Sequence, residues 1–361
     1  MKTFHCTHCD NLVFFENVVC LNCRRDLAFL PDALQMAALE HGEDGRWLYD
    51  GREYKPCANN VNHQICNWAL PIGDKEELCQ SCRLTHVIPD LSMAGNQEAW
   101  HRLEVSKRRL LYSLLALGLP LSRKSPADST GVEFEFMSDS PKANGDLSRV
   151  LTGHDNGVIT INVAEADDVY REQQRTRQNE PYRTLLGHFR HEIGHYYWDR
   201  LVQNTPRQGE FRELFGDESA NYQQALDQHY RNGPPANWEN DFISAYASTH
   251  PWEDWAESWA HVLHMIDALE TAASLGVSVK PRRSDEPSLA TPPPAFNVAG
   301  ADFDKMIRGW LSLTYVLNNF TRGLGLPDSY PFVLSQRVVG KLRFVYETIG
   351  QAAQSLPSPQ G

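Results

Sequence analysis

The sequence contains no hydrophobic run long enough to cross a membrane: its most apolar stretch, residues 110–121, falls well short of the ~20 residues that a spanning helix requires. Positive charge is also scarce, because 34 Lys and Arg face 46 Asp and Glu, which gives a formal net charge of −12. Residues 1–90 are acidic as well, whereas nucleic-acid-binding modules carry clustered Lys and Arg, so nucleic acid is not an expected partner. The first residues, MKTFHCTHC, lack the apolar segment of a signal peptide, and we expect a cytosolic protein without a membrane partner.

Cysteine is absent after residue 82, and the eight cysteines before this point form two sets of four. The first set consists of two C-x-x-C pairs, and the second of two single cysteines and one pair: Cys6, Cys9, Cys20 and Cys23, then Cys57, Cys66, Cys79 and Cys82. This spacing is typical of zinc ribbons, in which four thiolates hold one structural Zn²⁺. Disulfide bonds are the competing interpretation, and the C-x-x-C pairs argue against it. We therefore predict a tandem zinc-ribbon module over residues 1–90 with two structural zinc sites.

The rest of the chain contains the motif H-E-x-x-H, formed by His191, Glu192 and His195. It lies in a segment, residues 182–201, whose apolar spacing predicts an amphipathic helix. Residues four apart project from the same face of a helix, so the two imidazoles can bind one Zn²⁺. Glu192 is then placed to act as general base toward a zinc-activated water. The motif thus predicts a zinc metallohydrolase of the peptidase type.

A catalytic zinc has three protein ligands as a rule, so the third ligand must lie outside this motif. Trp198 and Leu201 occupy the positions at which a short-spaced motif would have Gly and His, which excludes that arrangement. The segment 246–264 is the best source, because it predicts a helix with an acidic stripe beside three tryptophans. We predict Glu253 as the ligand and Glu257, one turn later, as a carboxylate that holds a zinc histidine. The reverse assignment of the two glutamates stays open. Three histidines of the segment are weaker candidates: His250, His261 and His264.

The spacing Y-x₆-E-x-x-A-E, formed by Tyr246, Glu253 and Glu257, resembles the second active-site segment of glutamate-zincins of the anthrax lethal factor type. The resemblance implies that Glu253 binds zinc and that Tyr246 points at the metal, where its hydroxyl can stabilise an oxyanion. With its cysteine-rich N-terminus, the whole chain resembles bacterial zinc-binding metallopeptidases that carry an N-terminal zinc ribbon. That second resemblance implies a fold and a metal more directly than it implies a substrate.

The order of predicted elements indicates an α+β fold, with a zincin-like metallopeptidase core over residues 91–361 that follows the ribbon module at 1–90. This core should comprise a small sheet, the active-site helices and a helical C-terminal lobe. Strands are expected at 132–137 and 157–163, the latter either as a sheet edge that binds substrate backbone or as ordinary sheet. Residues 280–294 are rich in proline and should form a loop. Helices are expected at 98–117, 165–178, 182–201, 211–230, 252–270, 302–318 and 333–353.

These features predict a zinc-dependent peptidase with one catalytic and two structural Zn²⁺ ions. Its substrate should be a protein or peptide, and the zinc ribbons should recognise that substrate or a protein partner. Two alternatives stay open: a DNA-associated protease, against which the acidic N-terminus argues, and a non-catalytic scaffold whose zinc sites are purely structural. The presence of Glu192 argues against the scaffold, since a binding protein needs no general base.

Overall fold

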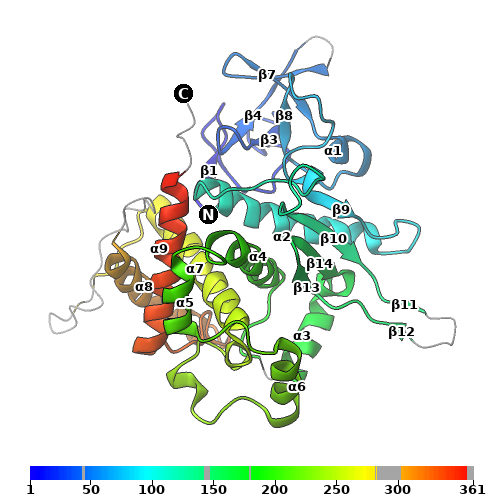
Figure 1. Ribbon diagram of the computed structural model, residues 1–361. Coiled ribbons are helices and arrows are strands. Elements are labelled where there is room, and N and C mark those ends of the chain that lie inside the picture. The colour runs from blue at the N-terminus through cyan, green and yellow to red at the C-terminus, as the bar shows by residue number, and fades with distance from the viewer. Residues whose placement is uncertain (43–44, 142–146, 179, 281, 283–301, 356–361) are drawn as a thin grey trace. The chain divides into compact units, whose positions relative to one another are not determined.

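The structure is a computed structural model, and Figure 1 shows its elements in chain order. It describes all residues except 43–44, 142–146, 179, 281, 283–301 and 356–361, so most of the loop expected at 280–294 lies outside the described residues. Contacts divide the chain into a unit of residues 3–116 and 121–171, here called the cysteine unit, and a unit of residues 1–2, 117–120 and 172–361, here called the helical unit. Among the described residues, no helix is both long and apolar enough to cross a membrane.

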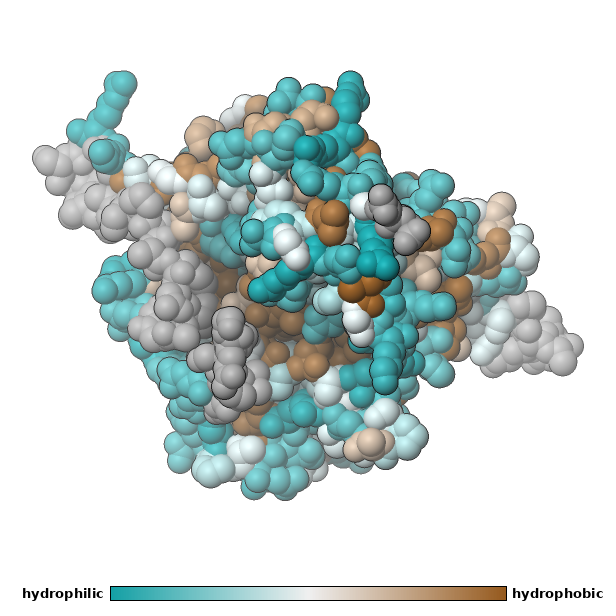
Figure 2. All heavy atoms as spheres, turned by 90° about the horizontal axis from the view of Figure 1, so that it is seen from above, coloured by the Kyte–Doolittle hydropathy of each residue, from teal (hydrophilic) through white to brown (hydrophobic). Residues whose placement is uncertain are grey.

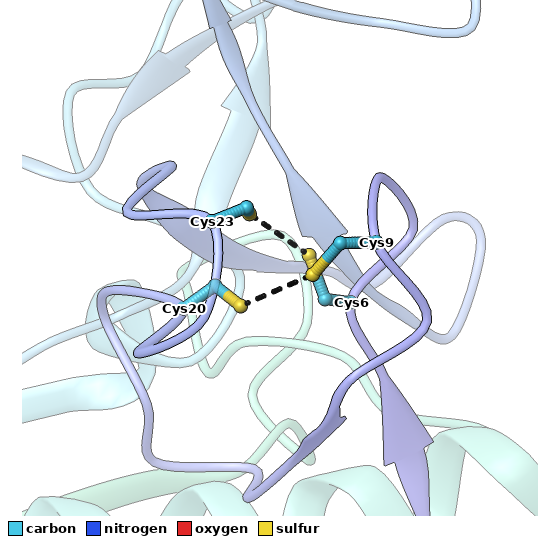
Figure 3. A group of neighbouring side chains, drawn as sticks. All are labelled: Cys6, Cys9, Cys20 and Cys23. Atoms are coloured by element: carbon cyan, nitrogen blue, oxygen red, sulfur yellow. Dashed lines mark hydrogen bonds between the residues drawn. The ribbon is translucent and has the colours of Figure 1, made fainter.

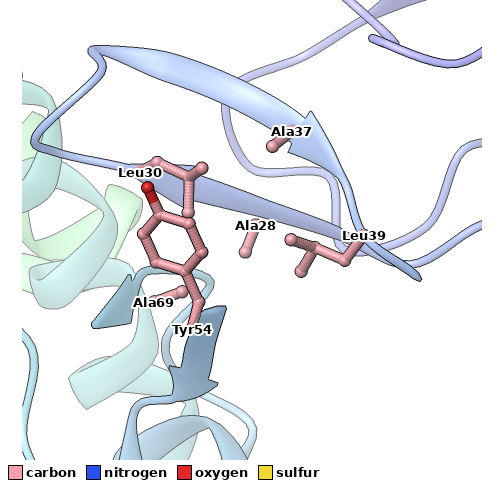
Figure 4. Close-up of a cluster of buried hydrophobic side chains, with 6 residues drawn as sticks. All are labelled: Ala28, Leu30, Ala37, Leu39, Tyr54 and Ala69. Carbon is pink, nitrogen blue, oxygen red and sulfur yellow. The ribbon is translucent and has the colours of Figure 1, made fainter. Parts of the chain in front are cut away.

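The N-terminal part of the cysteine unit consists of short antiparallel strands around a small apolar core. The strand pairs are β1 (Phe4–His5) with β2 (Leu12–Val13), β3 (Leu27–Leu30) with β4 (Gln35–Ala38), and a sheet of β5 (Glu40–His41), β6 (Trp47–Tyr49), β7 (Arg52–Pro56) and β8 (Ala69–Pro71), with α1 at Ala58–His63. The core residues drawn in Figure 4 are Ala28, Leu30, Ala37, Leu39, Tyr54 and Ala69. The Tyr54 hydroxyl remains satisfied by donating to Asp32 Oδ2 at 2.9 Å. Three of the six side chains are alanines, so this cluster by itself buries little apolar area. The same unit also buries an aromatic cluster, which consists of Phe4, Phe15, Phe29, Trp68 and Tyr112.

A second sheet in the cysteine unit has the strand order β13-β14-β10-β9. Its strands are β9 (Thr85–Val87), β10 (Glu133–Met137), β13 (Gly153–Asp155) and β14 (Val158–Asn162), and a two-stranded ribbon of β11 (Ser140–Pro141) and β12 (Leu147–Ser148) lies between β10 and β13 in the sequence. Strand β10 runs parallel to both β9 and β14, whereas β13 is antiparallel to β14. The strand expected at 157–163 is present as β14, but it is an inner strand of the sheet. The sheet-edge interpretation is therefore wrong, and the alternative of ordinary sheet agrees with the structure. Asn156 and Gly157 both have positive φ, 48° and 84°, and form the turn that adds β13 as the edge.

The longest helix of the cysteine unit, α2 (Asn96–Ala116), agrees with the helix expected at 98–117. It buries leucines together with charged groups, and Lys107 Nζ lies 2.9 Å from Glu104 Oε2 with both side chains fully buried. Two short 3₁₀ helices, η2 (Cys82–Leu84) and η3 (Val163–Ala166), belong to the same unit, and η3 packs against α2. The next helix, α3 (Asp168–Arg177), leads from the cysteine unit into the helical unit.

The helical unit contains the remaining helices that the structure describes. They are α4 (Leu185–Leu201), α5 (Arg207–Phe215), α6 (Tyr222–Asn232), η4 (Trp238–Asn240), η5 (Tyr246–Ser248), α7 (Pro251–Ser274), α8 (Phe303–Gly323) and α9 (Gln336–Ser355). The single helix expected at 211–230 is wrong, because the chain breaks between α5 and α6. Gly216 ends α5 with φ at 107°, which favours glycine, and the Asn221 side chain begins α6 by accepting from the backbone N–H of Gln224.

Helices α4 and α7 form the centre of the helical unit. The ring of Tyr197 on α4 stacks on Trp259 of α7 with 4.8 Å between centroids, and the Trp255 indole donates to the carbonyl oxygen of Gly194 at 2.8 Å. Helix α9 joins them through a buried ion pair, in which Lys341 Nζ lies 2.5 Å from Asp254 Oδ2.

Hydrophilic residues predominate on the outer face shown in Figure 2, and hydrophobic ones gather there in smaller groups.

Gly194 allows the close approach of α4 and α7, and we expect Gly194→Ala to destabilise the protein. An added Cβ would lie 3.1 Å from Ala256 Cα and 3.1 Å from Trp259 Cβ, and the first of these belongs to the backbone of α7, which would have to shift by a few tenths of an ångström. Overpacking of this kind costs about 1–3 kcal/mol, more than the ~1 kcal/mol that alanine gains over glycine in a helix. The matched control is Gly209→Ala on α5, where an added Cβ meets nothing within 4 Å. Denaturant titration should show opposite signs for the two variants, and stabilisation by both would contradict the prediction.

Candidate metal centres

Helix α4 presents the two histidines of H-E-x-x-H side by side. The helix begins at Leu185, three residues later than the expected start at 182, because the Thr184 hydroxyl caps it by accepting from the Gly187 N–H at 3.0 Å. One turn separates His191 from His195, and their ring centroids are 5.0 Å apart. Both imidazoles can therefore reach one ion.

Helix α7 brings Glu253 to these histidines. Pro251 is tolerated in the first turn, where its missing N–H removes no helical hydrogen bond, so the helix starts just ahead of Glu253. Glu253 Oε2 lies 2.9 Å from His191 Nε2 and 3.6 Å from His195 Nε2. In tetrahedral zinc with bonds of 2.0–2.2 Å, ligand atoms are about 3.3 Å apart, so these donor atoms fit such an ion. Among the described residues, this trio is one of three clusters of potential ligand atoms within 4.8 Å of one another.

Glu257 lies on the other side of the His191 ring. Its Oε1 is 2.8 Å from His191 Nδ1, and its Oε2 accepts from the Ser244 hydroxyl at 2.7 Å. An imidazole that binds a metal through Nε2 typically donates its Nδ1–H to a carboxylate, which fixes the ring and raises its basicity. The geometry thus supports the order in which Glu253 faces the metal position and Glu257 orients the histidine.

The three other histidine candidates have partners elsewhere. His250 Nδ1 accepts from the Trp252 N–H at 3.1 Å, where it caps α7. His261 Nδ1 lies 2.8 Å from the Tyr330 hydroxyl. His264 Nδ1 lies 2.6 Å from one terminal nitrogen of the Arg190 guanidinium, and the other terminal nitrogen of that group donates to Asp267. None of the three belongs to the cluster of His191, His195 and Glu253.

Charge is concentrated in the interior of this site. Burial lowers the pKa of His191, but the carboxylates of Glu253 and Glu257 outweigh it and hold that pKa well above its ordinary value. Burial raises the pKa of Glu253, but the positive charges of His191 and His195 outweigh this effect. The pKa of Glu253 therefore lies well below its usual range. A divalent cation would take the place of the protons that these buried groups otherwise share, which couples metal binding to proton release.

Glu192 is buried at 7% exposure on the same turn of α4 as His191. Burial raises the pKa of its carboxyl, while His191 and His195 counteract part of that effect. A carboxylate with a raised pKa is a stronger base, which is a property that general bases need.

Two tyrosines complete the site, and sequence analysis identified only one of them. Tyr246 lies in η5, with its ring 6.0 Å from that of His191. Tyr222, the first residue of α6, donates its hydroxyl to Glu253 Oε1 at 2.5 Å. Burial and the Glu253 charge raise the pKa of both phenols, so both stay protonated near neutral pH. No local pattern marks Tyr222, because it lies 31 residues from Glu253 in the sequence and only the tertiary fold brings the two together.

The eight cysteines form the other two clusters, and none is in a disulfide. In the first cluster Cys6 Sγ lies 3.7 Å from Cys23 Sγ, and Cys9 Sγ lies 3.6 Å from Cys20 Sγ (Figure 3). Tetrahedral zinc with Zn–S bonds of ~2.3 Å separates its sulfurs by about 3.8 Å, so the spacing fits. The two knuckles repeat one turn, since Asp10 N donates to Cys6 O and Arg24 N to Cys20 O, both at 2.9 Å.

The second cluster, Cys57, Cys66, Cys79 and Cys82, is buried throughout. Cys66 Sγ and Cys79 Sγ lie 3.6 Å apart, which again fits a shared zinc. Backbone N–H groups point at the sulfurs, as from Cys79 to Cys57 at 3.3 Å and from Trp68 to Cys66 at 3.4 Å. Such donors stabilise negative charge on sulfur, as expected for thiolate ligands.

Comparison with known proteins agrees with both kinds of centre. Residues 96–348 match the family described as "Putative zinc-binding metallo-peptidase", and residues 3–93 match a zinc-ribbon domain family. Uncharacterized proteins of Mycobacterium bovis and of two Mycobacterium tuberculosis strains, CDC 1551 and H37Rv, are each 43% identical over 355 residues, covering 98% of this chain and 96% of theirs. No solved structure matches significantly. The chain therefore belongs to this family of zinc-binding metallopeptidases and carries a zinc-ribbon domain at its N-terminus.

Proposed function

We propose that this protein is a zincin-like zinc peptidase in which His191, His195 and Glu253 hold one catalytic Zn²⁺. The observation that carries the proposal is the meeting of these three donors from α4 and α7, with Glu192 buried on the same turn as His191. Three protein ligands leave a fourth position for water or substrate, which is the arrangement of catalytic rather than structural zinc.

In the proposed mechanism of peptide hydrolysis, each residue of the site has a separate role. Bound Zn²⁺ supplies Lewis acidity that lowers the pKa of a water molecule toward neutrality. Glu192 accepts the proton of the attacking water and delivers it to the leaving amine. The Tyr246 hydroxyl donates to the oxyanion that develops on the scissile carbonyl. Glu257, held by Ser244, keeps the His191 ring in the orientation that binds metal through Nε2.

The two cysteine clusters would hold two structural zinc ions, which brings the total to three per chain. Each has four thiolates and no open ligand position, so neither supports hydrolysis. We assign the ribbons to recognition of a protein partner or of the protein substrate. The acidic net charge of −12 favours a protein over nucleic acid as that partner.

The proposal is tested by Glu192→Gln, which keeps the size of the side chain and removes the base. We expect hydrolysis of a fluorogenic peptide library by the zinc-loaded protein to fall about 10²–10⁴-fold, with the zinc content unchanged. Glu213→Gln, an exposed glutamate on α5, is the control and should retain activity. A wild-type protein that holds its zinc but cleaves no peptide in the library would instead support a non-catalytic scaffold.

A further inference from the structure

We propose that Tyr222 is a positioning residue of the zinc site, which holds one oxygen of Glu253 so that only the other oxygen binds the metal. The inference rests on the proposed ligand set and deepens it, because it assigns a function to a side chain outside both active-site motifs.

The two oxygens of Glu253 have different neighbours. Oε2 faces the metal position, at 2.9 Å from His191 Nε2 and 3.6 Å from His195 Nε2. Oε1 accepts from the Tyr222 hydroxyl at 2.5 Å. The Glu253 side chain is only 1% exposed, so water cannot readily replace this donor. A short hydrogen bond from a hydroxyl to a buried carboxylate is among the stronger ones in proteins.

Tyr222 is held in place by His250, the residue that caps the helix carrying Glu253. His250, the cap of α7, accepts from the Trp252 N–H through Nδ1 and donates through Nε2 to the carbonyl of Ala220 at 3.1 Å. Both bonds are satisfied by one neutral tautomer, with the proton on Nε2. His250 thereby fixes the chain two residues before Tyr222, and its ring packs edge-on against the Tyr222 ring at 5.2 Å. One capping residue thus places the phenol over the glutamate one turn further along α7.

The consequence for the metal concerns coordination number. A carboxylate whose second oxygen is free can bind zinc through both oxygens, which fills the position that water or substrate needs. A hydrogen bond to Oε1 opposes this change and orients the carboxylate for single-oxygen binding. Partners of metal ligands of this kind typically contribute 10–100-fold to metal affinity.

The experiment compares the full-length wild type with Tyr222→Phe, which removes only the hydroxyl. Tyr315→Phe is the matched control, because Tyr315 lies on α8 of the same unit and is 56% exposed. Glu253→Ala is the reference for a lost ligand. Two quantities are measured: the zinc affinity of the weakest site by competition with a chelator, and the visible absorption after that site is loaded with Co²⁺.

For Tyr222→Phe we expect zinc affinity to fall about 10–100-fold at one site, with the two other zinc ions retained. The Co²⁺ absorption should weaken, because entry of the second carboxylate oxygen raises the coordination number. An affinity within twofold of wild type and an unchanged Co²⁺ spectrum would overturn the inference while leaving the proposed function intact. If Glu253→Ala itself binds zinc as wild type does, the proposed ligand set fails, and the inference fails with it.

Discussion

Replacing Glu253 by alanine is expected to lower the zinc content from about three ions per chain to about two and to abolish peptide hydrolysis. The carboxylate is the group through which α7 reaches the histidines of α4, and its Oε2 lies within 3.6 Å of both Nε2 atoms. Two histidines alone form an incomplete site, so the ion should be lost on mild dialysis. Elemental analysis of the dialysed protein measures the first effect, and cleavage of the fluorogenic library measures the second.

Glu257→Ala provides the comparison that distinguishes the two glutamates. Glu257 contacts His191 Nδ1 at 2.8 Å, on the opposite side of the ring from the metal position. Loss of the Glu257 carboxylate should therefore lower the zinc affinity of this site about 10–100-fold, while the site should still fill at saturating zinc. If zinc is lost from Glu257→Ala and retained by Glu253→Ala, the reverse assignment is correct.

The second large effect is expected for Cys66→Ser, which should unfold much of the cysteine unit. Structural zinc contributes on the order of 10–16 kcal/mol of binding free energy, as much as the net stability of about 5–15 kcal/mol that a typical domain has. We do not expect the cluster around Tyr54 and the aromatic cluster beside it to replace a contribution of this size, because both lie among strands of only two to five residues. Limited proteolysis with mass spectrometry should show new cleavage sites in residues 3–116, together with the loss of one zinc per chain.

The environment of this cluster enlarges the expected effect. Arg108 on α2 is 3% exposed, and its guanidinium donates to the carbonyl of Ile65 at 2.7 Å. Burial lowers the pKa of Arg108, but negative charge on Cys66 and on Glu104 outweighs this effect and raises the pKa, so charge on the cysteines would help to stabilise the buried cation. Loss of the zinc would let the thiols protonate and leave this cation without part of its compensation, which is costly in a buried site.

Ser81→Ala is the matched control for Cys66→Ser. Ser81 is fully buried beside Cys82, yet it is not a ligand. The control should keep both structural zinc ions and the wild-type cleavage pattern. A protease-resistant Cys66→Ser protein that has lost its zinc would contradict the prediction, since it would show that the fold does not require this metal.

Most of the candidate metal ligands could be identified from local sequence patterns. The spacing of His191 and His195 depends only on the helical repeat, and so does the spacing of Glu253 and Glu257. The C-x-x-C pairs likewise act within one turn of chain, which is why the two sets of cysteines could be separated without a structure. Boundaries were less accurate where a single side chain decides them, as with Thr184 at the start of α4 and Gly216 at the end of α5.

By itself, the sequence indicated which residues could bind a metal, their spacing on each helix and the division of the cysteines into two sets, because helical spacing and the C-x-x-C pairs are local features and the two sets are separate along the chain. Only the tertiary structure decided which oxygen of Glu253 faces the histidines and that Tyr222, 31 residues away, holds the other. It also decided that β13 rather than β14 forms the sheet edge. These features depend on how distant segments pack, for example on the close approach of α4 and α7 at Gly194 and on the turn at Asn156 and Gly157, and no motif describes such packing.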